Sequence, residues 1–479
     1  MDLQVKVGKV GGVEDVELSE PVSPIGQYLN SSVLSIHIIG VLEFDNPIDD
    51  ASRLALYIID VFLPINHRFS SIMVEDKEEG KRWKRVQVKV EDHIVVPSFP
   101  EALSPESYDH YFSDYLSNIS MEPLPQTQPL WEIHIIKYPT SNASGSVVFK
   151  LNHALGDGYS IMGAVLSCLQ RADNPSLPLT FPVIRKTRKP ENDLKSFFSV
   201  LALGLSGARN SVLDFGWSIL KSSFLEDNRT PIHSGKEGVE FRPINIMTMT
   251  FSLDQIKQIK SSLQATINDV VCGMIFLGIR LYMEETSEET VSTRSTALVV
   301  LNTRSISGYK SVDEMLQNQE AKSLWGNQCL FLHIPLPELH QNGNPLNPLK
   351  FVEETQNVVK RMRNSFAVYL NGMLLESIRK FRGLEATSRY VHRTLKNSSI
   401  LVTNVIGPLE KITLSNQTVK GMYFMGVNFP QSLTVTIISY TDQLRVAVGA
   451  EKDFIDHVKF RTCTEKAFNM IYDAAVKPN

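Results

Sequence analysis

Strands and amphipathic helices alternate along both halves of this 479-residue chain, on either side of a segment rich in proline and charge. Apolar runs at residues 33–39 and 86–90 have the composition of β-strands. A chain of this length exceeds what one hydrophobic core usually serves. The pattern predicts an α/β (α+β layered) fold, with one domain over residues 1–180 and a second over residues 246–479.

Residues 181–245 are predicted to be a crossover linker that contains an apolar helix. The second domain then begins with a strand at 246–253, a helix around 254–262 and a strongly apolar helix over 268–283. Further strands are predicted at residues 296–301, 329–334, 400–405, 433–439 and 444–450. Because both halves are built from similar elements, we expect two related domains that face each other across a cleft.

Composition argues against several classes of protein. Hydrophobic residues make up 43% of the chain and charged residues 21%, which suits a globular protein with a substantial core. The net charge of -4 provides no broad positive field, so nucleic acid is not an expected partner. Four scattered cysteines without a CxxC pair argue against a disulfide framework and against a zinc site, namely Cys168, Cys272, Cys329 and Cys463. A reducing compartment fits best, and the N-terminus lacks the apolar run of a secretory signal.

Two apolar stretches are candidates for membrane segments. Residues 421–441 contain Asn428 and Pro430 and are predicted to be strands instead. Residues 196–220 start with an apolar run but contain Arg209 and Asp214, which suits a helix that lies on a membrane better than one that crosses it. A helix packed against the protein body is the alternative, because apolar periodicity does not separate the two.

The segment from Asn152 to Gly158 carries the main chemical signal. A strand at 146–151 and a helix at 160–169 flank it, so His153 is predicted at a strand end that a cleft can reach. Gly156 and Gly158 permit a tight turn, and Asp157 is expected to hold the local backbone or pair with a distant arginine. A bare His-x-x-x-Asp pattern is weak, since His110 also has Asp114 four residues on, within a helical pattern. The alternative for His153 is a structural histidine in a turn.

Transfer of an acyl group from a thioester to an alcohol is one chemistry that requires a histidine such as His153. A neutral imidazole can remove the hydroxyl proton as the oxygen attacks, because its pKa lies nearest neutral pH. The chain has no G-x-S-x-G motif, and no cysteine has a convincing catalytic partner, so a covalent acyl-enzyme is not indicated. We therefore predict direct attack with His153 as general base and no metal.

Several blocks resemble the wax ester synthase/diacylglycerol acyltransferase family, in particular its plant branch. Residues 152–158 match the HHxxxDG pattern except that Asn152 replaces the first histidine, and Pro129-Leu130-Trp131 matches a PLW motif. Three further blocks are similar, at residues 66–71, 266–271 and 403–408. The resemblance implies two chloramphenicol-acetyltransferase-like domains with the active site in a channel between them.

The resemblance also implies substrates and site residues. Fatty acyl-CoA would be the donor and co-substrate, with no other cofactor, and a long-chain alcohol or diacylglycerol the acceptor, giving wax esters or triacylglycerol. It assigns the base to His153, and Asn152 cannot replace a histidine as a proton acceptor at neutral pH. Asn268 is the candidate to polarise the thioester carbonyl, with a helix cap as the alternative. Residues expected to contact substrate are Asn152, Gly158, Trp131 and Asp269, although Trp131 also suits a packing corner.

Two other functions remain open from the sequence. One is a BAHD-like acyltransferase for a specialised alcohol, although the run Asp214-Phe215-Gly216-Trp217 lies in the linker and Ser218 replaces the final glycine of that family's DFGWG motif. The other is a non-catalytic protein that binds acyl-CoA or lipid, motivated by Asn152. The resemblance implies a membrane surface as partner, at the endoplasmic reticulum or the plasma membrane, with the catalytic domains facing the cytosol. Nothing in the sequence predicts the oligomeric state.

Overall fold

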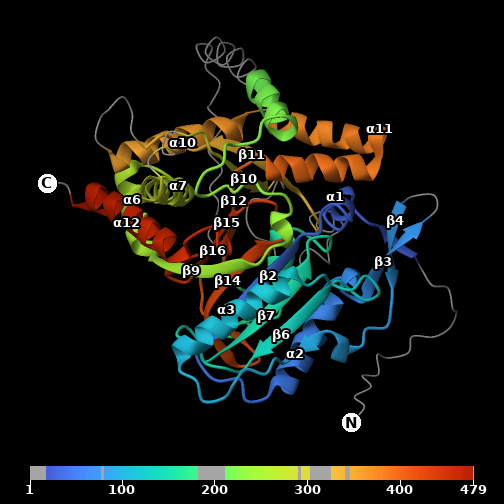
Figure 1. The fold of residues 1–479 in the computed structure, drawn as a ribbon. Coiled ribbons are helices and arrows are strands. Elements are labelled where there is room, and N and C mark those ends of the chain that lie inside the picture. Colours follow the sequence, from blue (N-terminus) through green and yellow to red (C-terminus); the bar gives the residue numbers. More distant parts are fainter. Residues whose placement is uncertain are drawn as a thin grey trace, which may run out of the picture.

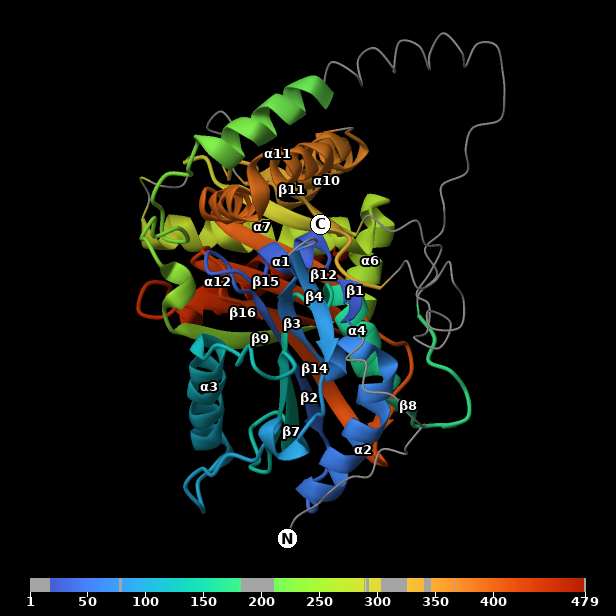
Figure 2. The same ribbon diagram turned by 90° about the vertical axis from the view of Figure 1, so that its right-hand side faces the viewer.

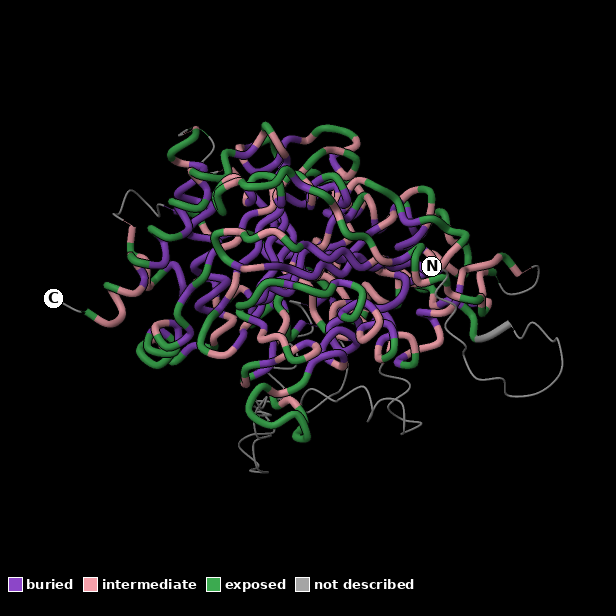
Figure 3. The backbone as a smooth tube through the Cα atoms, turned by 90° about the horizontal axis from the view of Figure 1, so that it is seen from below, coloured by how far each residue is buried: buried purple, intermediate pink, exposed green. Residues whose placement is uncertain are grey.

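The computed structural model describes residues 18–76, 80–181, 211–287, 289, 293–302, 325–339, 346–365 and 367–477. Two mixed α/β units lie against each other, one below the other in Figure 1. Buried backbone is concentrated in the middle of the molecule, and the exposed backbone surrounds it (Figure 3). The predicted fold class is confirmed.

A seven-stranded sheet forms the lower unit among the described residues. Its strand order is β5 (Ile94–Val95), β6 (Trp131–Ile136), β7 (Gly145–Asn152), β2 (His37–Phe44), β14 (Gln417–Val427), β13 (Ile412–Leu414) and β8 (Gln170–Arg171). The central neighbours β7, β2 and β14 pair antiparallel, with His37 opposite Asn152. A small sheet of β1 (Leu18–Pro21), β4 (Gly80–Arg85) and β3 (Ser71–Asp76) lies beside it.

The upper unit contains a six-stranded sheet. Its order is β11 (Cys329–Pro335), β10 (Thr296–Asn302), β12 (Ile400–Ile406), β15 (Leu433–Tyr440), β16 (Gln443–Glu451) and β9 (Ile244–Ser252). Strands β10, β12 and β15 run parallel, whereas the other neighbours pair antiparallel. All the strands predicted for this half are present, and the apolar stretch at residues 421–441 forms β-structure as predicted.

The domain ranges 1–180 and 246–479 do not map one to one onto the two sheets. Strands β13 and β14 come from the C-terminal part of the chain but belong to the seven-stranded sheet, where β14 pairs with β2. The side chains of β14 explain this, since Met422 and Phe424 pack into the N-terminal core. The two units are therefore joined by shared sheet hydrogen bonds as well as by packing.

Helices cover the sheets on several sides. In the lower unit, α2 (Ala51–Ile65) and α3 (Pro105–Met121) lie on opposite faces of the sheet (Figure 2). Alternation along β2 matches this arrangement, because Ile38 and Leu42 join the core under α2 while Ile39 and Val41 join the core under α3. Other helices are α1 (Pro24–Tyr28), α4 (Gly158–Ser167), α6 (Leu253–Leu263), α7 (Ile267–Thr286), α10 (Pro348–Asn364), α11 (Ala367–Lys396) and α12 (His457–Val476), with short 3-10 turns η1 (His67–Ser70), η2 (Val90–Asp92) and η3 (Val239–Phe241).

No single helix in the described part of the chain is both long and apolar enough to cross a bilayer. Helices α6 and α7 meet the criteria together, but they are bent by 100° relative to each other.

Two predicted strands are wrong in position. The first was expected at residues 33–39, but β2 begins only at His37, after a tight turn closed by a bridge between Asn30 and Ser35. The second was expected at 86–90, but β4 ends at Arg85 and the following backbone pairs with no strand. Val88 and Val90 pack against the N-terminal core, so their alternation reflects burial of side chains without sheet formation.

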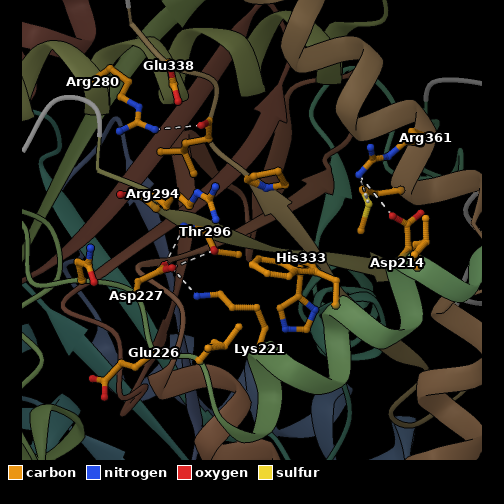
Figure 4. Close-up of a pocket in the computed structure, with 18 residues that line it drawn as sticks. Asp214, Lys221, Glu226, Asp227, Arg280, Arg294, Thr296, His333, Glu338 and Arg361 are labelled. Carbon is orange, nitrogen blue, oxygen red and sulfur yellow. Dashed lines mark hydrogen bonds and ion pairs between the residues drawn. The ribbon is translucent and has the colours of Figure 1, made fainter. Parts of the chain in front are cut away.

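Most of the predicted linker, residues 182–210, lies outside the described residues, and residues 211–223 form a helix. Asp227, which follows this helix, anchors it to the upper sheet (Figure 4). Its carboxylate pairs with buried Lys221 and accepts hydrogen bonds from Thr296 N at 2.7 Å and Ser399 N at 3.0 Å. One buried carboxylate therefore connects the helix, β10 and the start of β12.

Replacing Asp227 with alanine is expected to lower the free energy of unfolding by about 3–5 kcal/mol, because Lys221 would remain buried without its counter-charge. Urea unfolding followed by circular dichroism measures the change. Asp254→Ala is the matched control, since Asp254 is exposed and its ion pair with Lys257 spans 3.1 Å at the surface. That control should change the free energy by less than about 1 kcal/mol, and equal losses in both variants would contradict the proposed anchor.

Candidate active site

His153 lies in the turn between β7 and α4, as the sequence predicts. Its backbone N–H donates to Ile36 O at 2.9 Å, which fixes the turn against the segment that leads into β2. Its ring Nδ1 lies 2.8 Å from Asn327 Oδ1, and Asn327 Nδ2 donates to His153 O at 3.0 Å. His153 is partly exposed as a residue. A single amide from the segment before β11 therefore binds both the backbone and the ring of His153.

This double contact determines which ring nitrogen carries the proton. The carbonyl oxygen of His153 can only accept, so the amide NH2 of Asn327 must face it. The amide oxygen then faces Nδ1, and that nitrogen must be the protonated one. Nε2 is left with its lone pair, which is the form that a general base requires.

Burial also favours the neutral imidazole. Desolvation lowers the pKa of His153 below its usual value, and the nearby Asp157 carboxylate and the Asn327 contact offset part of this effect. At neutral pH His153 is therefore uncharged and able to accept a proton.

Asp157 holds the turn, which is the first of its two predicted roles. Its Oδ1 accepts from Ser160 N at 3.1 Å and caps α4, while its Oδ2 accepts from Gln328 N at 2.8 Å. The carboxylate therefore binds backbone N–H groups on both sides of the seam, and its effect on His153 is electrostatic.

Residues 325–328, which we call the motif strap, cross from the upper unit to the turn around His153. Trp325 Nε1 donates to Leu155 O at 3.1 Å, and Arg68 Nη1 donates to the same oxygen at 3.2 Å. Ser160 Oγ lies 3.0 Å from both Gly326 N and Gly326 O. The sequence prediction missed the strap. Its only local signal is the Trp-Gly-Asn-Gln run just before β11.

Asn152, the residue that departs from the family pattern, is fully buried at the end of β7. Its Nδ2 donates to Asn30 Oδ1 at 3.2 Å, and its Oδ1 accepts from Ala154 N at 2.8 Å. Both ends of the amide are thus bound within the protein. This arrangement favours a structural role for Asn152 over the predicted substrate contact.

Trp131 is also completely buried. Its indole N–H donates to Phe69 O at 2.8 Å, and its ring stacks on His93 with centroids 4.1 Å apart. The structure therefore favours the packing alternative for the PLW motif.

The remaining predicted residues meet near the ends of α7 and β12. The helix cap that was the alternative for Asn268 is formed instead by Thr266, in a capping box with Asp269 at the start of α7. Asn268 Oδ1 accepts from Asn404 Nδ2 at 3.1 Å. On the other face of β12, Val405 lies 3.7 Å from the position that a Cβ on Gly158 would occupy. Gly158 is thus at the seam between the units. Asn268 is hydrogen-bonded to Asn404, near the end of the same strand, β12.

A separate cavity of about 620 Å³ lies between the 211–223 helix and the β10–β11 edge (Figure 4). None of the predicted site residues lines it. Asp214 of the Asp-Phe-Gly-Trp run is on its wall, paired with Arg361 at 3.3 Å. Burial and nearby Lys221 lower the pKa of His333, another lining residue, to about 4. Because Asp214 pairs with Arg361, the Asp-Phe-Gly-Trp run belongs to a helix that is anchored to the upper unit.

Comparison with known proteins decides the family. The wax ester synthase/diacylglycerol acyltransferase catalytic domain matches residues 79–271, and the WS/DGAT C-terminal domain matches residues 325–472. The chain belongs to the wax ester synthase/diacylglycerol acyltransferase family. It is accordingly an acyltransferase, and the first match contains His153 and its turn.

Relatives support the assignment over nearly the whole chain. Wax ester synthase/diacylglycerol acyltransferase 4 of Arabidopsis thaliana is 27% identical over 91% of this chain and 86% of its own length. Number 8 of the same plant is 28% identical over 92% of this chain and 93% of its own length. Together with the two domain matches, these relatives place the chain in the plant branch, as the motifs predicted.

Solved structures agree on the fold alone. The wax ester synthase/diacylglycerol acyltransferase from Marinobacter aquaeolei VT8 superposes with a TM-score of 0.60 at 14% identity, covering 95% of this chain and all of the other. The starter condensation domain of rhizomide synthetase reaches a TM-score of 0.51 at 11% identity, covering 94% of this chain and 92% of the other.

Proposed function

We propose that this acyltransferase moves a fatty acyl group from acyl-CoA to the hydroxyl of a long-chain alcohol or of diacylglycerol, with His153 as general base. The observation that carries the proposal is the contact with Asn327, which places the ring proton on Nδ1 and the lone pair on Nε2 of His153. The related plant proteins are named for wax ester synthesis and diacylglycerol acylation, which supports lipid acceptors.

In the proposed reaction, His153 Nε2 removes the proton from the acceptor hydroxyl while its oxygen attacks the thioester carbonyl. The tetrahedral intermediate collapses, the C–S bond breaks, and the imidazolium returns the proton to the CoA sulfur. Asn268 is the proposed donor to the carbonyl oxygen, since its Oδ1 is bound by Asn404 and its Nδ2 remains a donor.

Direct transfer fits the state of the cysteines better than a covalent acyl-enzyme does. Burial raises the pKa of Cys168, Cys272 and Cys463 to about 12, so these thiols are protonated and poor nucleophiles at neutral pH. Cys329 is partly exposed, at the start of β11.

The proposal is tested by giving the purified protein long-chain acyl-CoA with either a fatty alcohol or diacylglycerol. Wax ester or triacylglycerol formation with release of CoA is the expected result. Saturable acyl-CoA binding without an ester from either acceptor would overturn it in favour of a non-catalytic binding protein. Ester formation only with a small specialised alcohol would favour the BAHD-like alternative.

We also propose that the protein works at the cytosolic face of the endoplasmic reticulum, with the plasma membrane as the alternative. Acceptors of this kind are held in bilayers, so an enzyme that acts on them gains from being close to a membrane. Imaging a fluorescent fusion together with markers for both membranes tests this proposal, and a fusion that stays diffuse would contradict it.

A further inference from the structure

The 211–223 helix has an unusual outward side. Val212 is 66% exposed and Leu213 is 63% exposed, and Phe224, immediately after the helix, is 77% exposed. The charged residues of the helix, Asp214 and Lys221, are buried and paired on the inward side. A helix at a water-exposed surface normally has the opposite pattern, with polar residues facing outward. The outward side of this helix is therefore suited to an apolar environment.

The tip of α11 combines exposed apolar and basic side chains. Phe381 is 80% exposed, and Lys380 and Arg382 flank it. Among the described residues, neither of these cations forms an ion pair, although the hydrogen-bonded Arg379 and the nearby Lys380 both lower the pKa of the Glu376 carboxylate. Gly383 has a φ of 83°, so α11 reverses there into a helical hairpin whose turn projects from the molecule (Figure 1). The reversal places Phe381 and its two cations at an outer corner.

The 211–223 helix contacts the first half of α11 and lies on the same side of the molecule (Figures 1 and 2). Asn371 of α11 donates to Ser218 Oγ at 2.8 Å, which joins the inward side of the helix to the first half of α11. Figures 1 and 2 both place the two elements on the same side of the molecule, beyond the six-stranded sheet. Tyr369 and Met373, each 67% exposed, extend the apolar surface along α11. Exposed apolar side chains that gather in this way mark an interaction surface.

We propose that this surface, the docking face, binds a bilayer that contains anionic lipids. The docking face consists of Val212, Leu213, Leu220, Phe224, Tyr369, Lys380, Phe381, Arg382 and Met373. Its apolar side chains enter the boundary between headgroups and acyl chains, and Lys380 and Arg382 meet the lipid phosphates.

The charge pattern favours a bilayer over a protein partner. A second copy of this chain would bring the same two cations to the interface, where like charges repel. An anionic bilayer provides both an apolar interior and negatively charged headgroups. The sequence just before the helix adds to the argument, since it contains the basic cluster Arg185, Lys186, Arg188 and Lys189 and an apolar run at residues 197–203. The inference deepens the proposed function, because lipid acceptors would then be supplied from the membrane to which the enzyme binds.

Vesicle flotation with the full chain and without substrates tests the docking face. The parent protein should float with vesicles of phosphatidylcholine and phosphatidylserine. Phe381→Ser should lower the ratio of bound to free protein about tenfold, because one large apolar side chain no longer inserts. The control is Val458→Ser on α12, which removes a 63% exposed apolar side chain outside the docking face and should bind as the parent does.

Charge reversal tests the cations separately. Lys380→Glu with Arg382→Glu should abolish the preference for phosphatidylserine over pure phosphatidylcholine vesicles, while far-UV circular dichroism stays unchanged. A parent protein that does not float, or a Phe381→Ser variant that floats as well as the parent, would overturn the proposal. So would a dimer in size-exclusion chromatography that Phe381→Ser dissociates. Turnover of detergent-dispersed substrates is measured independently, so failure of docking can be told apart from failure of the proposed reaction.

Discussion

Replacing His153 with alanine is expected to reduce kcat/KM for ester formation about 10²- to 10⁴-fold, because the variant lacks the proposed general base. Acyl-CoA consumption with a fatty alcohol or diacylglycerol, followed by ester analysis, measures the loss. Binding of acyl-CoA should be largely retained, since the side chain of His153 is a small part of the turn and its backbone contacts remain.

The chain supplies its own matched control for this variant. His110 also stands four residues before an aspartate, but it is exposed on α3. His110→Ala should therefore leave kcat/KM unchanged. Equal loss in both variants, or full activity in His153→Ala, would exclude His153 as the base.

The pH profile of the parent enzyme gives a further check on the same residue. Only the neutral imidazole acts as a base, and burial lowers the pKa of His153 below the ordinary value of 6.5. Activity should therefore persist as the pH falls through 6.5 and decline only at lower pH, where His153 becomes protonated. A decline centred above 6.5 would contradict this assignment.

Asn327 variants are expected to have the second largest effect, because Asn327 fixes both the orientation and the tautomer of His153. Asn327→Ala should lower kcat about ten- to hundredfold with little change in KM, since a misplaced base weakens the transition state more than substrate binding. Asn364→Ala, an exposed amide at the end of α10, is the control and should have no effect.

Asn327→Asp separates positioning from general structural damage. A carboxylate beside Nδ1 raises the pKa of the imidazole, because it stabilises the protonated ring. The acid side of the pH profile should then move to higher pH in Asn327→Asp but not in Asn327→Ala. If both variants lose activity without this difference in pH dependence, Asn327 has only a structural role.

The elements that the sequence predicts correctly are those formed by local interactions. The apolar runs predicted β7 and α7, and the strand, turn and helix around His153 were found as expected. Asp157 caps α4 three residues away, within the range that a sequence pattern can indicate. The alternating valines after β4 predict a strand that does not form. The same alternation also arises when side chains pack against the core without sheet pairing.

The motif strap could not be predicted, because its partners are distant in the chain. Asn327 lies 174 positions from His153, and Gln328 lies 171 positions from Asp157. The buried amide of Asn152 was likewise assigned to substrate, since no local pattern indicates its contact with Asn30, 122 positions earlier.

The sequence by itself determined the fold class, the strands of the six-stranded sheet, the strand and helix around His153 and the identity of the candidate base, because helix and strand periodicity, turn glycines and caps act over a few neighbouring residues. Only the tertiary structure decided that β14 completes the N-terminal sheet, that Asn327 sets the tautomer of His153, and that the apolar side of the 211–223 helix faces outward. These features depend on which distant segments meet, and that is set by packing of the whole chain.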